Sequence, residues 1–165
     1  IIDKHAAHER MLFEKFKANR DGIETQMLLA PVTVTLSKEE YSAVLDNLDL
    51  LEKAGYHVED FGGGMVIVNE CPTAVADADL AEVIMELAGH LVTGQKELVP
   101  EKLDWIYHST ACRAAIKAGD KTTDYELNRF VESLLNNPDI RYCPHGRPVL
   151  VEMSRYEIEK NFGRV

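Results

Sequence analysis

The sequence predicts an α+β fold with two lobes, from the spacing of its apolar residues and the distribution of its charges. Apolar residues recur every three to four positions in several long segments and alternate in several short ones, which indicates helices and strands in one chain. Residues 1–20 carry five basic and three acidic side chains, residues 21–101 three and sixteen, and residues 102–165 ten and nine. We expect a near-neutral lobe from residues 1–30 and 102–165 and an inserted acidic lobe from residues 31–101, the alternative being a single domain with an acidic face.

Helix boundaries are marked by capping residues and glycines. Ser37 and Thr123 are each followed three residues later by a glutamate, which is the capping-box pattern of a helix start. Gly22 and Gly55 follow two segments of helical periodicity and mark their ends. The helices expected in chain order are residues 5–19, residues 37–54, a segment from Asp77 or Asp79 to Val92, residues 103–118, residues 123–136 and a terminal helix from Ser154 that carries Tyr156, Ile158 and Phe162.

Strands are expected where apolar residues alternate. The triple glycine Gly62-Gly63-Gly64 separates two such runs and predicts a hairpin turn, since it lacks the Lys-Ser/Thr pair and the following helix of a phosphate-binding loop. Pro31 lies in another run, where an edge strand or a bulge tolerates proline. The strands expected in chain order are residues 1–3, 27–36, 56–61, 65–71 and 148–153.

Composition excludes several classes of protein. The chain has 165 residues and a formal net charge of -10, so we expect any contact with nucleic acid to be local. The sequence contains no apolar run of 18 residues and no signal segment at its start, which predicts a soluble chain without a membrane partner. Its three cysteines form no CxxC pair, which favours reduced thiols in a cytosol over a disulfide framework.

A first group of candidate chemical residues opens the chain. His5 and Glu9 are four residues apart, so a helix places both on one face. Asp3 precedes that helix, where it can cap the helix or bind a cation. The order His-x-x-His-Glu differs from the HExxH and HxxEH patterns of metallopeptidases. The alternative interpretation is a capped amphipathic helix with solvated side chains.

A second group lies between Tyr142 and Pro148. In an extended segment Cys143 and His145 point the same way, because they are two positions apart. Two prolines stiffen the segment, and Gly146 permits a turn. A thiolate beside an imidazole suits zinc or manganese better than magnesium. The alternative is a buried cysteine and a hydrogen-bonded loop histidine.

A third group surrounds Cys112, which lies among small residues of an expected helix. Arg113 and Lys117 are four residues apart on one side of that helix. Together with Lys121 and Arg147 they can hold a phosphate next to a metal. A core cysteine with a solvated basic face is the other interpretation.

Carboxylates, imidazoles and thiols thus come from three separated segments of the near-neutral stretches, and at this point the sequence resembles a known family. The order and the distances of four motifs resemble the C-terminal domain of the mismatch-repair protein MutL, of the nicking-competent bacterial type, across essentially the whole chain. The motifs are Asp3-Lys4-His5-Ala6-x-x-Glu9-x4-Glu14, Ala111-Cys112-Arg113, Cys143-Pro144-His145-Gly146-Arg147-Pro148 and Phe162-Gly163-Arg164.

The resemblance implies a two-metal site that hydrolyses DNA. Its metal ligands would be Asp3, His5, Glu9, Cys112, Cys143 and His145, of which Asp3, His5 and Glu9 would be catalytic and Glu9 and Cys143 shared between metals. Arg113, Lys117 and Arg147 would position the DNA. The implied cofactors are Zn²⁺ in a structural or regulatory role and Mn²⁺ or Mg²⁺ for catalysis. The resemblance also implies a homodimer in the bacterial cytoplasm, with duplex DNA and, through the full-length protein, the mismatch-recognition protein MutS as partners.

Lys4 departs from the family pattern, which usually has glutamine at this position. A lysine there can repel cations or contact phosphate. We therefore expect the ligand set to be retained and the affinity for metal to differ.

A further motif runs from Gln26 to Pro31. Gln26, Met27, Leu28, Leu29 and Pro31 are similar to the segment by which MutL proteins bind the replication sliding clamp, a glutamine followed by apolar side chains in an extended peptide. The sliding clamp is a ring around DNA, so binding to it would raise the effective concentration of this acidic domain at the DNA. A half-buried strand explains the same residues.

Two further functions compete with the endonuclease. The first is a non-catalytic dimerisation module in which one zinc ion is bound by His5, Cys112, Cys143 and His145. Such a closed zinc site needs neither Asp3 nor Glu9 as a ligand. The second, a peptidase or a deaminase, is disfavoured by motif order and by the absence of an H-x-E…P-C-x-x-C pattern.

Overall fold

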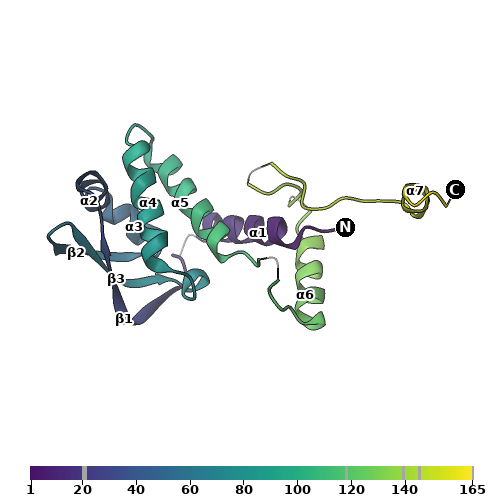
Figure 1. Cartoon of the computed structure of the whole chain (residues 1–165), viewed down its shortest axis with the longest axis horizontal. Helices are drawn as coiled ribbons and strands as arrows, with labels where there is room; N and C mark the ends of the chain where they lie inside the picture. Colours follow the sequence, from purple (N-terminus) through teal and green to yellow (C-terminus); the bar gives the residue numbers. More distant parts are fainter. Residues whose placement is uncertain (20–21, 118, 139, 145, 165) are drawn as a thin grey trace. The chain divides into compact units, whose positions relative to one another are not determined.

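The computed structural model describes residues 1–19, 22–117, 119–138, 140–144 and 146–164. The chain divides into two compact units. The terminal unit consists of Ile1–Met11 and Ala115–Val165, and the middle unit consists of Leu12–Ala114. Helix α1 (Lys4–Ala18) begins in the terminal unit and ends in the middle unit. The fold class is α+β, as the apolar spacing predicts (Figure 1).

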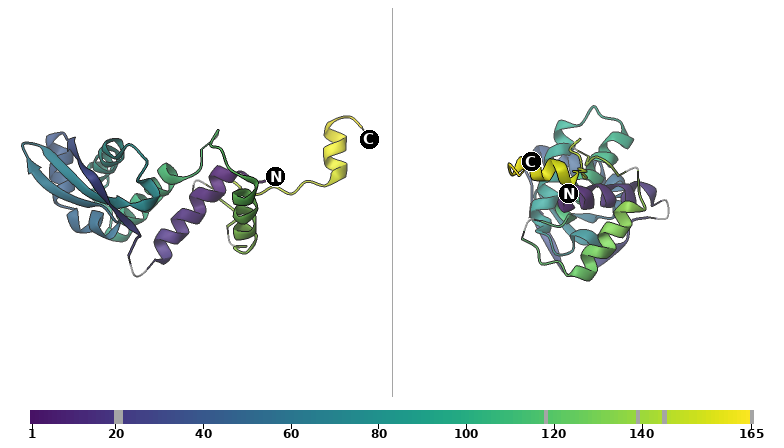
Figure 2. Two further views of the ribbon diagram at one scale, coloured as in Figure 1. Left: turned by 90° about the horizontal axis from the view of Figure 1, so that it is seen from below. Right: turned by 90° about the vertical axis from the view of Figure 1, so that its right-hand side faces the viewer.

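The middle unit contains a three-stranded antiparallel sheet. Strands β1 (Thr25–Thr35), β2 (His57–Gly62) and β3 (Met65–Pro72) lie in the order β1-β3-β2, and Figure 2 shows them side by side as one twisted sheet. The hairpin predicted from the three glycines is confirmed. Gly62, Gly63 and Gly64 all have positive φ angles, of 84°, 65° and 82°, which a residue with a side chain rarely adopts.

Helices cover one face of this sheet. They are α2 (Lys38–Leu45), α3 (Leu48–Lys53), α4 (Leu80–Thr93) and α5 (Val99–Ala114), with a 3-10 turn η1 at Thr73–Val75 (Figure 1). Because side chains alternate along a strand, every second residue enters the core between sheet and helices. The strand and helix residues buried in this core include Val34, Val58, Val66, Val68, Val44, Leu51, Val83, Ile84, Leu87, Leu91 and Ile106.

Two of the helix predictions differ from the structure. The helix expected over residues 37–54 starts at its predicted capping box, where Ser37 and Glu40 bond each other's backbone, but it breaks into α2 and α3. The break comes where the side-chain amide of Asn47 donates to the carbonyl of Ala43 at 2.8 Å. The helix expected over residues 103–118 is α5, which starts earlier because Pro100 falls in its first turn, where no intrahelical N–H bond is lost.

The terminal unit holds the start of α1, helix α6 (Asp124–Leu135) and helix α7 (Arg155–Asn161). The capping box of α6 at Thr123 and Glu126 is confirmed. The strands expected at residues 1–3 and 148–153 exist only as local pairing: Ile1 and Val151 exchange hydrogen bonds, and the isolated bridge Ile2 to Leu150 lies beside them. The buried apolar cluster of this unit consists of Ala6, Ala7, Leu134, Cys143 and Val149.

The predicted lobe boundaries would cut two regular elements. A boundary after residue 30 falls inside β1, and one before residue 102 falls inside α5. Among the described residues, no helix is both long enough and apolar enough to cross a membrane.

Candidate functional site

Two histidines on the first turns of α1 bind the backbone N–H and C=O of one residue, Ile116. Nδ1 of His5 lies 2.9 Å from the carbonyl oxygen of Ile116, and the N–H of Ile116 donates to Nδ1 of His8 at 3.1 Å. A carbonyl oxygen only accepts hydrogen bonds, so Nδ1 of His5 carries a proton. A backbone N–H only donates, so Nδ1 of His8 carries none.

These two bonds give the histidines opposite tautomers. In neutral His5 the lone pair lies on Nε2, which is the arrangement of a metal ligand whose other ring nitrogen is held by a carbonyl. Neutral His8 has its proton on Nε2, and its Nδ1 lone pair is already used. Burial lowers the pKa of His8, and the neighbouring His5 lowers it further, which favours this neutral form.

The carboxylates of this segment differ in their surroundings. One oxygen of Asp3 accepts the backbone N–H of Ala6 at 3.0 Å, so Asp3 caps α1 as its sequence position suggests. Its side chain is exposed, and a carboxylate has further lone pairs for a cation. Glu9 is buried, with 2% of its surface exposed. A buried carboxylate requires a cation or hydrogen-bond donors to stay charged.

Cys143 lies in a tight loop of the terminal unit. Its N–H donates to the carbonyl of Arg147 at 2.8 Å, and its carbonyl accepts the N–H of Gly146 at 2.8 Å. The cysteine is 3% exposed and belongs to the apolar cluster that includes Ala6 and Ala7 of α1. The structure thus brings Cys143 to the helix that carries His5. His145 lies outside the described residues.

Cys112 and Arg113 belong to the middle unit, at the end of α5. The Arg113 guanidinium pairs with Glu86 and, at 2.8 Å, with Glu82, both from α4. Ser109 donates a further hydrogen bond to Glu86 at 2.7 Å. Arg113 is therefore held by two carboxylates, which its neighbours in the sequence do not predict. The signal for it is the four-residue spacing of Glu82 and Glu86, which places both on one face of α4.

The other candidate phosphate ligands lie in the terminal unit. Lys117 and Arg147 are both exposed. Lys117 lies beyond the end of α5, so the expected placement of Arg113 and Lys117 on one helical face is wrong. The backbone N–H of Lys117 donates to the carboxylate of Asp120 at 2.6 Å, which shapes the loop.

Lys4 is engaged within the terminal unit. Its ammonium donates to the hydroxyl of Thr122 at 3.1 Å and lies 3.4 Å from the carbonyl oxygen of Asp120. A cavity of about 330 Å³ adjoins these groups and is also lined by Ile116 and Phe130. Because its ammonium already has two oxygen partners, Lys4 is oriented toward the loop that precedes α6.

The described residues form no cluster that could hold a metal ion. Within this part of the chain, which lacks His145, no three side chains of His, Cys, Asp or Glu lie close enough to hold a metal ion. Asp3 caps α1, His5 and Glu9 lie on its first two turns, and Cys143 packs in the apolar cluster that includes Ala6 and Ala7 of the same helix. By chemistry these donors fit a divalent transition metal, since they combine imidazole, thiol and carboxylate.

The segment similar to a clamp-binding peptide forms the irregular part of β1. Its pairing with β3 runs from Thr25 to Met27, is interrupted, and resumes at Val32. Met27 and Leu29 are strongly exposed, at 77% and 108% of their reference areas. Leu28 is instead packed against the core of the middle unit. The edge of the sheet therefore presents two large apolar side chains to solvent.

Comparisons with known proteins identify the family. Residues 1–122 match the family described as the MutL C terminal dimerisation domain. Across all of this chain, the DNA mismatch repair protein MutL of Clostridium tetani is 34% identical and that of Clostridium perfringens 36% identical. The MutL of Nitrobacter hamburgensis is 36% identical over 99% of the chain. The chain spans 27%, 25% and 28% of the length of these three relatives. It therefore belongs to the MutL C-terminal dimerisation domain family of DNA mismatch repair proteins.

Proposed function

We propose that this domain is a metal-dependent endonuclease that nicks one strand of duplex DNA in mismatch repair and that associates with a second copy of itself. The observation that carries the proposal is the hydrogen bond between Nδ1 of His5 and the Ile116 carbonyl, 2.9 Å long. It orients the ring and leaves Nε2 of the neutral imidazole as an electron-pair donor, as the backbone partner of a metal-bound histidine does.

The proposed ligand set extends from this histidine. Glu9 and Cys143 are the donors proposed to be shared between two metals, and Asp3 contributes a carboxylate at the start of α1. Cys112 and His145 enter the set by their motifs. Zn²⁺ is the proposed structural or regulatory ion, and Mn²⁺ or Mg²⁺ the catalytic one. Bound by such donors, two divalent ions supply charge stabilisation for the attacking and leaving oxygens of a phosphodiester.

Side chains of the protein itself would hold the DNA. Lys117 and Arg147 are exposed cations in the unit that carries His5, and each can neutralise a phosphate. Arg113 is a weaker candidate, since Glu82 and Glu86 already balance its charge. The net charge of -10 opposes DNA binding elsewhere on the surface.

Nicking of supercoiled plasmid in Mn²⁺ tests the proposal. Glu9→Gln keeps the size of a buried side chain and removes its charge, so we expect relaxed circles to disappear in this variant. Glu132→Gln, on the exposed side of α6, is the matched control and should nick like the wild type. Equal nicking by the wild type and by Glu9→Gln would reject the proposed site.

A zinc-fastened dimerisation module is the alternative function, with His5, Cys112, Cys143 and His145 as the four ligands. It needs no carboxylates, so Glu9→Gln would leave zinc content and dimerisation unchanged and no nicking would be seen in any variant. Loss of the folded state on removal of zinc would favour this alternative.

Binding to the replication sliding clamp is a second proposed activity, favoured by the exposed Met27 and Leu29. An extended peptide that starts at Gln26 and ends at Pro31 can place both side chains in an apolar pocket. We expect Met27→Ala with Leu29→Ala to weaken clamp binding and to leave stability unchanged, since both side chains are exposed. Leu28→Ala alone should destabilise the domain, because Leu28 packs on the core.

The remaining partners belong to the whole protein. We propose that the full-length protein acts in the bacterial cytoplasm and meets the mismatch-recognition protein MutS through segments outside this chain. Pull-down of MutS by the full-length protein, with this domain alone as the control, tests that proposal.

A further inference from the structure

The terminal helix α7 has apolar side chains and buries none of its residues. Ile158 and Phe162 are one helical turn apart and share a face, and they are 42% and 77% exposed. The capping box of Ser154 and Glu157 satisfies backbone N–H groups at the start of the helix. A helix of seven residues is nevertheless marginal in water by itself, so it needs a surface to pack against.

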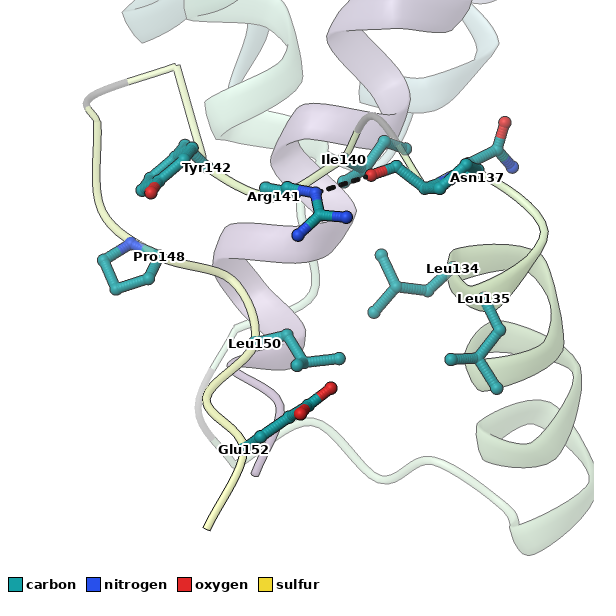
Figure 3. Close-up of a pocket in the computed structure, with 10 residues that line it drawn as sticks. Leu134, Leu135, Asn137, Ile140, Arg141, Tyr142, Pro148, Leu150 and Glu152 are labelled. Atoms are coloured by element: carbon teal, nitrogen blue, oxygen red, sulfur yellow. Dashed lines mark hydrogen bonds between the residues drawn. The ribbon is translucent and has the colours of Figure 1, made fainter.

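An apolar groove lies in the same terminal unit (Figure 3). Its volume is about 290 Å³. Leu134 on α6 and Leu150 on the facing segment point toward one another across it, as Figure 3 shows. Leu135 also lines the groove and is 65% exposed. The groove is therefore an open apolar surface in a unit with few other buried residues.

The weakness of the terminal core indicates that a second chain completes it. Among the described residues, its apolar cluster holds five buried side chains, and two of them are alanines. Units of this size rarely reach stability from one small core, and oligomerisation is a common remedy. The family to which the chain belongs is described as a dimerisation domain. A second copy is thus the occupant that the observations favour.

The length of the backbone before α7 distinguishes two arrangements. In one, α7 packs in the groove of its own chain, and in the other it packs in the groove of a second copy. Glu152 lines the groove, and only Met153 and Ser154 separate it from Arg155, the first residue of α7. Ser154 is extended, with φ −69° and ψ 157°. A linker of two residues, of which Ser154 is extended, spans at most about 7 Å, which is too short for the chain to turn back and lay α7 in the groove of its own copy.

We propose that α7 of each copy lies in the groove lined by Leu134, Leu135 and Leu150 of a second copy. Ile158 and Phe162 would fill the groove. The groove also presents Arg141 and Glu152. Because α7 carries side chains of both signs, each of these two charges can meet its opposite. The exchange is reciprocal, so the interface is self-complementary about a two-fold axis. This inference rests on the proposed self-association of the domain.

Cysteine cross-linking distinguishes exchange from packing within one chain. Leu135→Cys and Ile158→Cys are made on separate chains, mixed, and treated with a short bismaleimide. We expect a covalent dimer in the mixture, visible on a denaturing gel. The chain carrying both substitutions should also give dimers. A product of monomer mobility from that chain, with no dimer from the mixture, would overturn the exchange.

Two controls keep the result specific. Lys160→Cys replaces Ile158→Cys at an exposed position on the other side of α7, and we expect its dimer yield to be at least fivefold lower. Equal yields from the two positions would mean random collision and would overturn the proposal. The unsubstituted chain measures the background from its native cysteines.

Sedimentation of the same full chain separates the two proposals. We expect Ile158→Ser with Phe162→Ser to raise the dissociation constant of the dimer at least tenfold, with Lys160→Ser unchanged. A wild type that is monomeric at every concentration would reject self-association itself. A dimer of wild-type strength in the double variant would reject only the exchange of α7.

Discussion

Nδ1 of His5 lies 2.9 Å from the carbonyl oxygen of Ile116, while the N–H of the same residue donates to His8. The backbone of one residue, Ile116, thus fixes which Nδ1 atom carries a proton. In the neutral form the lone pair of His5 lies on Nε2 and is open to a ligand, whereas that of His8 lies on Nδ1 and accepts the Ile116 N–H. The two histidines are three residues apart and differ in which ring nitrogen is free to bind a metal.

The first prediction concerns metal affinity. We expect His5→Gln to weaken Zn²⁺ binding by at least about tenfold, because it removes a donor nitrogen. His8→Gln is the matched control: its amide oxygen can still accept the Ile116 N–H, so zinc affinity should stay near the wild-type value. Competition with a chromophoric chelator measures both. Equal losses in the two variants would show that the tautomers do not select the ligand.

The second prediction separates two roles of Asp3. Asp3→Asn keeps an oxygen that can accept the Ala6 N–H, so its free energy of unfolding should stay within about 0.5 kcal/mol of the wild type, whereas Asp3→Ala should lose about 1 kcal/mol. Both variants should lose nicking, since both remove a charge from the proposed metal site. Urea unfolding and plasmid nicking give the two readouts. If Asp3→Asn nicks normally, Asp3 is a helix cap only.

Local signals in the sequence were sufficient to predict much of the fold. The capping boxes at Ser37 and Thr123 mark helix starts in the structure, and the hairpin turns at its three glycines. The predicted elements differ from the structure where hydrogen bonds to distant residues, or from competing side chains, determine the backbone conformation. The Asn47 side chain breaks a helix that periodicity would continue, and residues 148–153 pair too little to form a strand. Neither result can be derived from apolar spacing.

The candidate site shows the same limit. Helical spacing was enough to place His5 and Glu9 on one helix. It could not predict which nitrogen of His5 is protonated, because that depends on Ile116, 111 residues away. Arg113 was interpreted as a phosphate ligand because nothing near it in sequence reveals its partners. Its acidic partners come from α4, on a different helix.

The third prediction therefore concerns the DNA-contacting cations. A plot of log affinity against log salt concentration has a negative slope. Lys117→Gln and Arg147→Gln should each make that slope less steep by about 1, since each removes one phosphate contact. Arg113→Gln should leave the slope unchanged. Fluorescence anisotropy of a duplex titrated at several KCl concentrations measures the slopes. A full unit lost in Arg113→Gln would show that this guanidinium reaches DNA despite Glu82 and Glu86.

The fourth prediction concerns acid stability and follows from Glu86. Burial acts to raise the pKa of this carboxyl, but hydrogen bonds from Ser109 and Arg113 outweigh it, and the pKa lies below its ordinary value. The unfolded chain then binds a proton at higher pH than the folded one. The contribution of Glu86 to stability is therefore complete at neutral pH and is lost as the pH falls through the lowered pKa.

Replacement of Glu86 by glutamine should remove this contribution. At pH 7 we expect Glu86→Gln to lose about 1 kcal/mol of unfolding free energy, a value kept small because the side chain is partly exposed. Between roughly pH 5 and pH 3 the stability of the wild type should fall toward that of the variant, because protonation ends the ion pair in the wild type alone. Glu39→Gln, at an exposed position of α2, is the control and should run parallel to the wild type. Urea unfolding across this pH range decides the matter: a constant gap between the wild type and Glu86→Gln would mean that Arg113 does not hold the charge of Glu86.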